Sequence, residues 1–257
     1  MTQIPQTEIP QTDAPKVGTL KVGTLKTVVF DAPDHRALAK FYVDLFGGEQ
    51  SFADDDWATI HTPDGWRLGF QPAPDHVPPR WPDPDAPQQM HLDIQVPDRE
   101  VVTKRAEQLG ASRIGGGETW NVMADPAGHP FCLCTNKQDE PIRIFAVNID
   151  TSDSKGTAAF YEALLGMSVK YEGDEAMWVG AESGPMGEML FQQVKDHRAP
   201  RWPDPAYPQQ LHLDITVEDI DEAEPKALAL GATRLPGEGD NWRVYADPAG
   251  HPFCLIF

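Results

Sequence analysis

The chain has 257 residues and a formal net charge of −19, because 40 acidic residues stand against 21 basic ones. A surface this acidic repels nucleic-acid backbones and anionic membrane faces, so we expect neither as a partner. No apolar run approaches the roughly 20 residues of a transmembrane helix, and a hydrophobic content of 40% is enough for a packed core.

The N-terminal residues 1–25 are expected to form a disordered tail that is not an export signal. Residues 1–15 carry acidic groups and no basic one, whereas a secretory signal needs a basic start followed by an apolar stretch. The chain has three cysteines, an odd number, which excludes a full disulfide framework. We therefore expect reduced thiols and a cytoplasmic location.

Residues 26–47 predict a strand, a turn and a helix. Asp34 is placed to cap the N-terminus of that helix. Four apolar residues recur at the spacing of one helix face, namely Leu38, Phe41, Tyr42 and Leu45. Residues 57–61 and 66–71 flank a Thr-Pro-Asp-Gly turn and indicate a hairpin.

Residues 89–135 repeat this scheme with a strand, a helix that Asp98 caps, and two strands broken at residues 125–128. The second half of the chain follows the same order. One local misfit is Pro225, which lies inside the fourth helical pattern. We expect it to start that helix late or to kink it.

The two halves of the chain are copies of each other. Residues 70–96 and 191–217 are identical at eighteen of 27 positions. Residues 120–133 and 242–255 are identical at twelve of fourteen. The period is far too long for a solenoid repeat, so it indicates a duplicated domain.

The duplication predicts two domains, at residues 26–135 and 143–257, each built from two modules of one strand, one helix and three strands. Each module would form a curved sheet with its helix on the outer face. Two modules of the same domain would then face each other and close a cup. The proline-rich segments 72–88 and 194–209 would join the modules within each domain.

The motifs FYVDLFGG, FYEALLGM, HLDI and DPAGHPFCL resemble the vicinal oxygen chelate superfamily, and most of all the tandem glyoxalase-like proteins of actinobacteria. The superfamily includes glyoxalase I, extradiol dioxygenases, fosfomycin-resistance enzymes and bleomycin-binding proteins. The resemblance implies an α+β fold in which four βαβββ modules form two tandem glyoxalase-like domains. It implies no single activity, since the superfamily supports several chemistries and also plain binding. It also implies a monomer that mimics the dimer of single-domain relatives, with a homodimer as the alternative.

Metal-dependent relatives place ligands on the first and last strand of each module. The resemblance puts these positions on Thr27, Gly69, His91 and Cys132 in the first half, and on Ala146, Leu190, His212 and Cys254 in the second. Each cup would keep one histidine and one cysteine, too few for zinc, and would lack the oxygen ligands of a hard metal site. We therefore expect no metal and no other cofactor. The second cup would be roomier, because Ala146 is smaller than Thr27.

Strand alternation selects the candidate catalytic residues. In QMHLDI the apolar side chains would pack under the helix, and the polar ones would face the cup. The candidates are His91, Asp93 and Cys132 in the first half and His212, Asp214 and Cys254 in the second. A histidine beside a cysteine can lower the thiol pKa and create a nucleophile, although a buried cysteine more commonly fills a core.

Aromatic and polar side chains around the predicted cups are candidate ligand-binding residues. They are Gln89, Gln210, Arg80, Trp81, Arg201, Trp202, Trp120, Trp242 and Tyr207. The Arg-Trp pairs lie in the DHxxPRWPDP segments, where they would either cover the cup mouth or form a rigid linker whose indole plugs the core. The histidines of the two DPAGHP turns, His129 and His251, are expected to serve the turn.

Three functions stay open at this point. The first is a metal-free cup that binds an aromatic or polycyclic small molecule, as in resistance by sequestration. The second is a lyase, isomerase or hydroxylase that uses His/Asp or His–Cys chemistry. The third is a metal-dependent glyoxalase or dioxygenase. The missing ligand set and the supply of aromatic residues favour the first.

Overall fold

The structure is a computed structural model of the chain and describes residues 21–136, 140–184, 186–204 and 206–257. Most of the predicted tail, residues 1–20, lies outside the described residues. The remainder of that segment is structured, which corrects the prediction for residues 21–25. The backbone N–H groups of Val22 and Gly23 donate hydrogen bonds to the carbonyl of Leu164, and Leu25 is buried in the core.

Each half of the chain contains two modules with the predicted order of one strand, one helix and three strands. The first module comprises β1 (Thr24–Ala32), α1 (His35–Phe46), β2 (Glu49–Ala53), β3 (Ala58–His61) and β4 (Arg67–Pro72). The second comprises β5 (Met90–Val96), α2 (Arg99–Gln108), β6 (Ser112–Gly116), β7 (Trp120–Ala124) and β8 (Pro130–Thr135).

The second half repeats this order. The third module comprises β9 (Arg143–Thr151), α3 (Ser154–Leu165), β10 (Ser168–Glu172), β11 (Ala176–Gly180) and β12 (Glu188–Gln193). The fourth comprises β13 (Leu211–Thr216), α4 (Ile220–Ala229), β14 (Thr233–Gly239), β15 (Trp242–Ala246) and β16 (Pro252–Ile256). The fold is therefore α+β with four βαβββ modules, as the sequence predicts.

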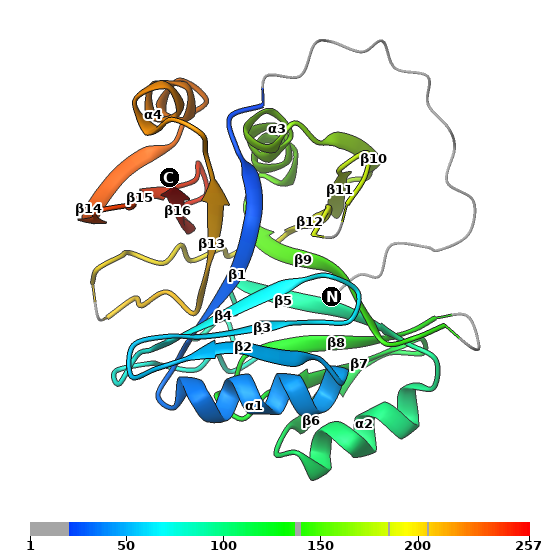
Figure 1. Ribbon diagram of the computed structural model, residues 1–257. Coiled ribbons are helices and arrows are strands. Elements are labelled where there is room, and N and C mark those ends of the chain that lie inside the picture. The colour runs from blue at the N-terminus through cyan, green and yellow to red at the C-terminus, as the bar shows by residue number, and fades with distance from the viewer. Residues whose placement is uncertain (1–20, 137–139, 185, 205) are drawn as a thin grey trace.

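Each of the two sheets takes one module from each half of the chain. The strand orders are β14-β15-β16-β13-β1-β4-β3-β2 and β10-β11-β12-β9-β5-β8-β7-β6. The joints are antiparallel pairs, β1 with β13 and β5 with β9. Figure 1 shows β1 beside β13, although they lie at opposite ends of the chain. Modules of the same half do not face each other across a cup, which corrects that expectation.

Modules of the same half meet through their helix-bearing faces instead. Figure 1 shows α1 and α2 on the same side of the molecule. The ring of Phe41 on α1 lies 6.2 Å from that of Phe131 on β8, and the Tyr42 hydroxyl donates a hydrogen bond to Asp125 at 3.0 Å. In the second half Tyr161 donates to Asp247 in the same way. This packing leaves the opposite, concave face of each sheet open.

Strand alternation positions the polar residues on that open face. In β13 the side chains of Leu211, Leu213 and Ile215 belong to the main core. His212 and Asp214, which alternate with them, point to the other face and line a cavity. The HLDI prediction is confirmed at this strand, because burial of the apolar set under the helix decides which face is inside.

The helices begin where the sequence predicts. Asp34 and Asp98 cap α1 and α2 by accepting backbone hydrogen bonds from Ala37 and Val101. Pro225 lies inside α4, yet that helix begins at Ile220, directly after its cap Asp219. The expected late start is therefore wrong, because the cap fixes the first turn upstream of the proline. None of the described helices is long and apolar enough to cross a membrane.

Candidate functional site

A cavity of about 590 Å³ lies on the concave face of the sheet that joins the first and fourth modules. Three indoles contribute to its wall: Trp57 from the loop before β3, Trp202 from the proline-rich connector, and Trp242 from β15. The polar lining residues include Gln71, Gln209, His212, Asp214 and Cys254. A cavity of this size, apolar at the wall with a few polar groups, is typical of a small-molecule site.

Hydrogen bonds hold two of these indoles in place. The Trp57 Nε1 donates to the Thr59 hydroxyl at 2.7 Å. The Trp202 Nε1 donates to the Pro236 carbonyl at 2.9 Å. Both rings are thus oriented before any ligand arrives, which reduces the entropy cost of binding.

His212 is the centre of the polar part of the cavity. Its Nε2 lies 3.6 Å from the Asp214 carboxylate, and its Nδ1 lies 3.2 Å from the Gln209 side-chain amide. Burial lowers the His212 pKa, but hydrogen bonds to Asp214 and Cys254 outweigh burial and raise this pKa well above the ordinary 6.5. A raised pKa favours the protonated ring, which suits His212 to donate a hydrogen bond or a proton to a bound molecule.

A second carboxylate, that of Asp31 on β1, lies behind His212 at 4.0 Å from its Nδ1. The amides of Gln71 and Gln209 both donate to Asp31, at 2.7 Å and 3.0 Å. Burial raises the pKa of Asp31, and His212 and the glutamines partly offset that rise. Asp31 thus holds in place two glutamines that line the cavity, and the Gln209 amide in turn contacts the His212 ring.

The equivalent cluster of the other sheet is more closely packed. His91 is 1% exposed, and its Nε2 lies 3.4 Å from Asp93. Burial raises the pKa of the Cys132 thiol well above its usual value, and the neighbouring Asp93 raises it further. This direction is opposite to the one that a nucleophilic thiolate requires.

Trp81 and Trp120 lie beside this first cluster and away from the large cavity. Both pack against the small group of buried side chains formed by Val122, Cys132 and Cys134. Trp202 and Trp242, their counterparts in the second half, line the large cavity. Trp81 also lines a smaller pocket of about 210 Å³ together with Gln88 and Asp150, so the same sequence position borders pockets of different size in the two sheets.

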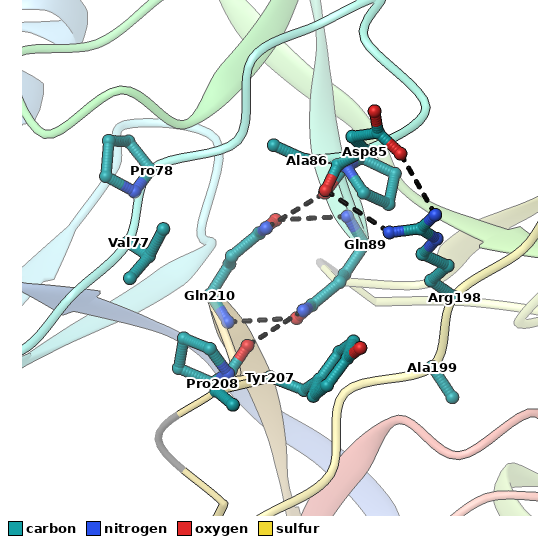
Figure 2. A pocket seen from close by; sticks show the side chains of 12 residues that line it. Val77, Pro78, Asp85, Ala86, Gln89, Arg198, Ala199, Tyr207, Pro208 and Gln210 are labelled. Carbon is teal, nitrogen blue, oxygen red and sulfur yellow. Dashed lines mark hydrogen bonds and ion pairs between the residues drawn. The ribbon is translucent and has the colours of Figure 1, made fainter.

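Gln89 and Gln210 do not line the cavity, which corrects their assignment to the ligand site. Each accepts a hydrogen bond from the other's backbone N–H, at 2.9 Å and 3.1 Å. Figure 2 shows this reciprocal pair at the junction of the two halves, beside the Asp85–Arg198 ion pair. Both glutamines precede their strands, so they join the two copies of the repeat.

Arg80, Arg201 and Tyr207 also lie outside the cavity lining. Arg80 pairs with Asp83 of its own connector at 2.9 Å. The Arg201 guanidinium stacks on the Tyr207 ring at 3.6 Å. The tyrosine is 39% exposed and borders the small pocket of Figure 2. These side chains contribute to the connectors themselves, because their charged groups and rings contact partners within the same connector.

Ala146 and Thr27 each border the cup opposite to the one expected from the sequence. Thr27 pairs with Asp214 across the β1–β13 joint, and Ala146 pairs with Asp93 across the β5–β9 joint. Thr27 therefore borders the cluster that contains His212. The two residues exchange cups because each sheet combines modules of different halves.

Four polar residues of the cavity lining were not among the candidates from the sequence, namely Asp56, Gln71, Gln209 and Asn241. A signal was present for two of them. Gln71 recurs at the equivalent position Gln192, and Gln209 is the first residue of a repeated Gln-Gln pair. Asp56 and Asn241 lie at strand ends in loops that differ between the two copies, so no pattern marks them.

The donor set at His212 fits a metal better than the sequence suggested. His212, Asp214 and Cys254 each offer one ligand atom, and these atoms lie within 4.8 Å of one another. His91, Asp93 and Cys132 form the same set in the other sheet. Three protein ligands with an open position suit catalytic zinc. The expectation of too few zinc ligands counted the histidine and the cysteine and omitted the aspartate. A zinc ion bound there would supply Lewis-acid chemistry or an activated water.

Comparison with known proteins identifies the fold. A family model described as a glyoxalase-like domain matches residues 27–134 and again residues 146–256. Glyoxalase I from Zea mays superposes with a TM-score of 0.59 at 17% identity, over 91% of this chain and 92% of that one. A putative dioxygenase from Bacillus subtilis superposes with a TM-score of 0.64 at 12% identity, over 93% and 85%. A search of the curated proteins found no significant match.

Proposed function

Because the chain belongs to the glyoxalase-like domain family, whose fold serves both binding and catalysis, we propose that its His212 cavity binds an aromatic or polycyclic small molecule without a metal. The observation that carries this proposal is the wall of three indoles, Trp57, Trp202 and Trp242, around one cavity of about 590 Å³. Indole faces stack on flat rings and gain both apolar burial and ring–ring attraction.

The polar groups at the base of the cavity orient the bound molecule. A ring N–H of His212 can donate and the Asp214 carboxylate can accept, so a ligand with a carbonyl or hydroxyl group finds a partner on either side. Gln71 and Gln209 are held by Asp31 and stay in place when a ligand enters. Pre-positioned polar groups of this kind give specificity, while the indoles give affinity.

A specific observation favours one alternative, an acid–base enzyme of the lyase, isomerase or hydroxylase kind. The His212 pKa is raised by hydrogen bonds to Asp214 and Cys254, and a histidine with a raised pKa beside a carboxylate can serve as a general acid next to a base. Recovery of the bound molecule unchanged after long incubation supports binding. Conversion of that molecule, lost in His212→Ala, supports the enzyme.

The proposal is tested with pyrenylmethanol, a neutral polycyclic probe, whose absorption overlaps indole emission. Titration of the wild-type protein is expected to quench tryptophan emission with saturation. Trp242→Ala is expected to weaken binding about tenfold or more, because truncation of a stacked aromatic anchor costs at least about 1.4 kcal/mol. Trp120→Ala, the matched change at the other cluster, is expected to leave affinity unchanged.

Two outcomes contradict the proposal. One is absence of saturable binding to the wild-type protein, and the other is equal loss in both tryptophan variants. Elemental analysis of the same sample tests the metal-free part. About one zinc per chain, removed by a chelator together with probe binding, would show that the three-donor cluster is a metal site.

A further inference from the structure

We infer that the His212 cavity selects aromatic molecules that carry a positive charge, an inference that rests on the proposed function and deepens it. The charges around the cavity point to this class. Two carboxylates, Asp56 and Asp214, are among its lining residues, and none of the described residues that line it is a lysine or an arginine. A cationic ring system would stack on the indoles and place its charge near a carboxylate.

Asp56 is the carboxylate best placed to meet a ligand cation. It is exposed, and it precedes the indole of Trp57 in the wall of the cavity. The neighbouring carboxylates have other partners, since Asp54 accepts backbone N–H bonds from Asp56 and Trp57, and Asp55 pairs with Arg36 at 2.5 Å. A cation over the Trp57 ring would therefore gain from the ring face and from Asp56 together.

A protonated His212 ring would not reverse this preference. Carboxylates flank the imidazole on both sides, with Asp214 at 3.6 Å and Asp31 at 4.0 Å. Its charge is thus directed towards groups of the protein. Among these groups the carboxylates outnumber the single histidine. The net charge of −19 adds attraction for cations at longer range.

The wall of the cavity adds a second attraction for cations that is independent of the carboxylates. Trp57 and Trp202 are fixed through their Nε1 atoms, and Trp242 is 37% exposed. An indole face is the strongest cation–π partner among side chains. An anionic aromatic would stack on the same faces but would meet repulsion from the ring quadrupole and the carboxylates alike.

The test compares three pyrene derivatives of similar size on the intact protein: pyrenylmethylamine, pyrenylmethanol and pyrenylacetate. The amine is expected to bind at least about fivefold more tightly than the alcohol, and the acetate more weakly than the alcohol. The advantage of the amine should shrink as salt rises from low concentration to about 0.5 M.

A matched pair of variants locates the effect. Asp56→Asn is expected to reduce the affinity of the amine about threefold or more and to leave that of the alcohol unchanged. Asp55→Asn changes the adjacent carboxylate, which is 96% exposed and paired with Arg36, and is expected to change neither affinity.

The outcomes separate this inference from the proposed function. Equal binding of the three probes, or tightest binding of the acetate, overturns the inference and leaves the aromatic site standing. Binding of none of the probes overturns the proposed function and the inference with it. An amine preference that Asp55→Asn abolishes and Asp56→Asn preserves contradicts the assignment to Asp56.

Discussion

His212 and His91 occupy equivalent positions on β13 and β5, yet their surroundings differ. His212 borders a cavity of about 590 Å³ together with three indoles. His91 is 1% exposed next to a cluster on which Trp81 and Trp120 pack. The pocket beside Trp81 measures about 210 Å³, so duplicated residues border sites of different size, and the surrounding side chains decide how large a ligand each copy can hold.

The three thiols differ in accessibility, which predicts an order of reaction. Cys254 is half-buried and lines the cavity, whereas Cys132 and Cys134 are buried. Burial also raises the pKa of Cys132, which keeps it protonated. Iodoacetamide is expected to modify Cys254 first in the native protein, as read by peptide mass spectrometry. Saturation with a bound aromatic probe should slow this reaction.

The variant Cys254→Ser supplies the control for this order. It should remove the fast phase of alkylation and leave the slow modification of the other two thiols. Faster modification of Cys132 than of Cys254 would show that the closed packing assigned to the first cluster is wrong.

Strand alternation predicts which side chains of β13 reach the site. Alternation places His212 and Asp214 on the open face, and the structure confirms that placement. Alternation does not reach Gln89 and Gln210, which precede their strands and turn to the junction between the halves. The lining residue Asp56 lies in a loop, where no periodicity constrains a side chain.

Among the structural elements, the DPAGHP turn is the most tightly bonded. The Asp125 carboxylate accepts backbone N–H bonds from Ala127 and His129, a bond from Tyr42, and a contact with the His129 ring at 3.0 Å. The prediction of a turn role for this histidine agrees with these contacts. The turn ties β8 to α1, so it joins the two modules of a half.

This turn predicts a pH dependence of stability. Burial lowers the His129 pKa, but the Asp125 carboxylate outweighs burial and raises this pKa above the ordinary 6.5. A histidine with a raised folded-state pKa contributes stability fully below pH 6.5 and loses that contribution as pH rises through the raised value. The contribution of His129 to the free energy of unfolding in urea should therefore fall as pH rises above 6.5.

The variant His129→Asn isolates the contribution of that histidine. It should be less stable than the wild type at pH 6, and the difference should narrow towards pH 9. A difference that stays constant or widens with pH would contradict the assignment of a charged His129. If the variant does not fold, NMR titration of the His129 ring in the wild type gives the same pKa directly.

Helix α4 predicts a stabilising substitution. Pro225 removes one backbone N–H from the interior of the helix, whereas α2 has Lys104 at the equivalent position. Pro225→Ala is expected to raise the free energy of unfolding by roughly 1–3 kcal/mol. Lys104→Pro is the reciprocal control and should destabilise the protein. A loss of stability in Pro225→Ala would indicate that the helix is adapted to the proline.

On the scale of the whole molecule, the pairing of modules was the part of the fold that the sequence predicted wrongly. The sequence predicts four βαβββ modules, and the structure confirms them. The sequence does not determine how the first strands of the four modules pair with one another. These strands, β1, β5, β9 and β13, carry similar apolar patterns, and each offers an open edge. The antiparallel joints β1–β13 and β5–β9 settle this choice in favour of pairing between the halves.

These joints predict that the two halves unfold together. Each sheet crosses from one half to the other, and the Gln89–Gln210 bonds add a further connection. Loss of one half would therefore leave a strand edge of the other unpaired in both sheets. Differential scanning calorimetry is expected to show one cooperative transition. Two separate transitions, one per half, would show that the halves are thermodynamically independent domains.

The central claim is that one of two equivalent cups binds an aromatic ligand, and the location of the bound ring tests it most directly. The chain has seven tryptophans, so ¹⁹F NMR of protein labelled with 5-fluorotryptophan reports on each of them after assignment by substitution. Titration with pyrenylmethylamine is expected to shift the resonances of Trp57, Trp202 and Trp242. Those of Trp66, Trp81, Trp120 and Trp178 should stay in place. Shifts at Trp81 and Trp120 without shifts at the first three would contradict the account.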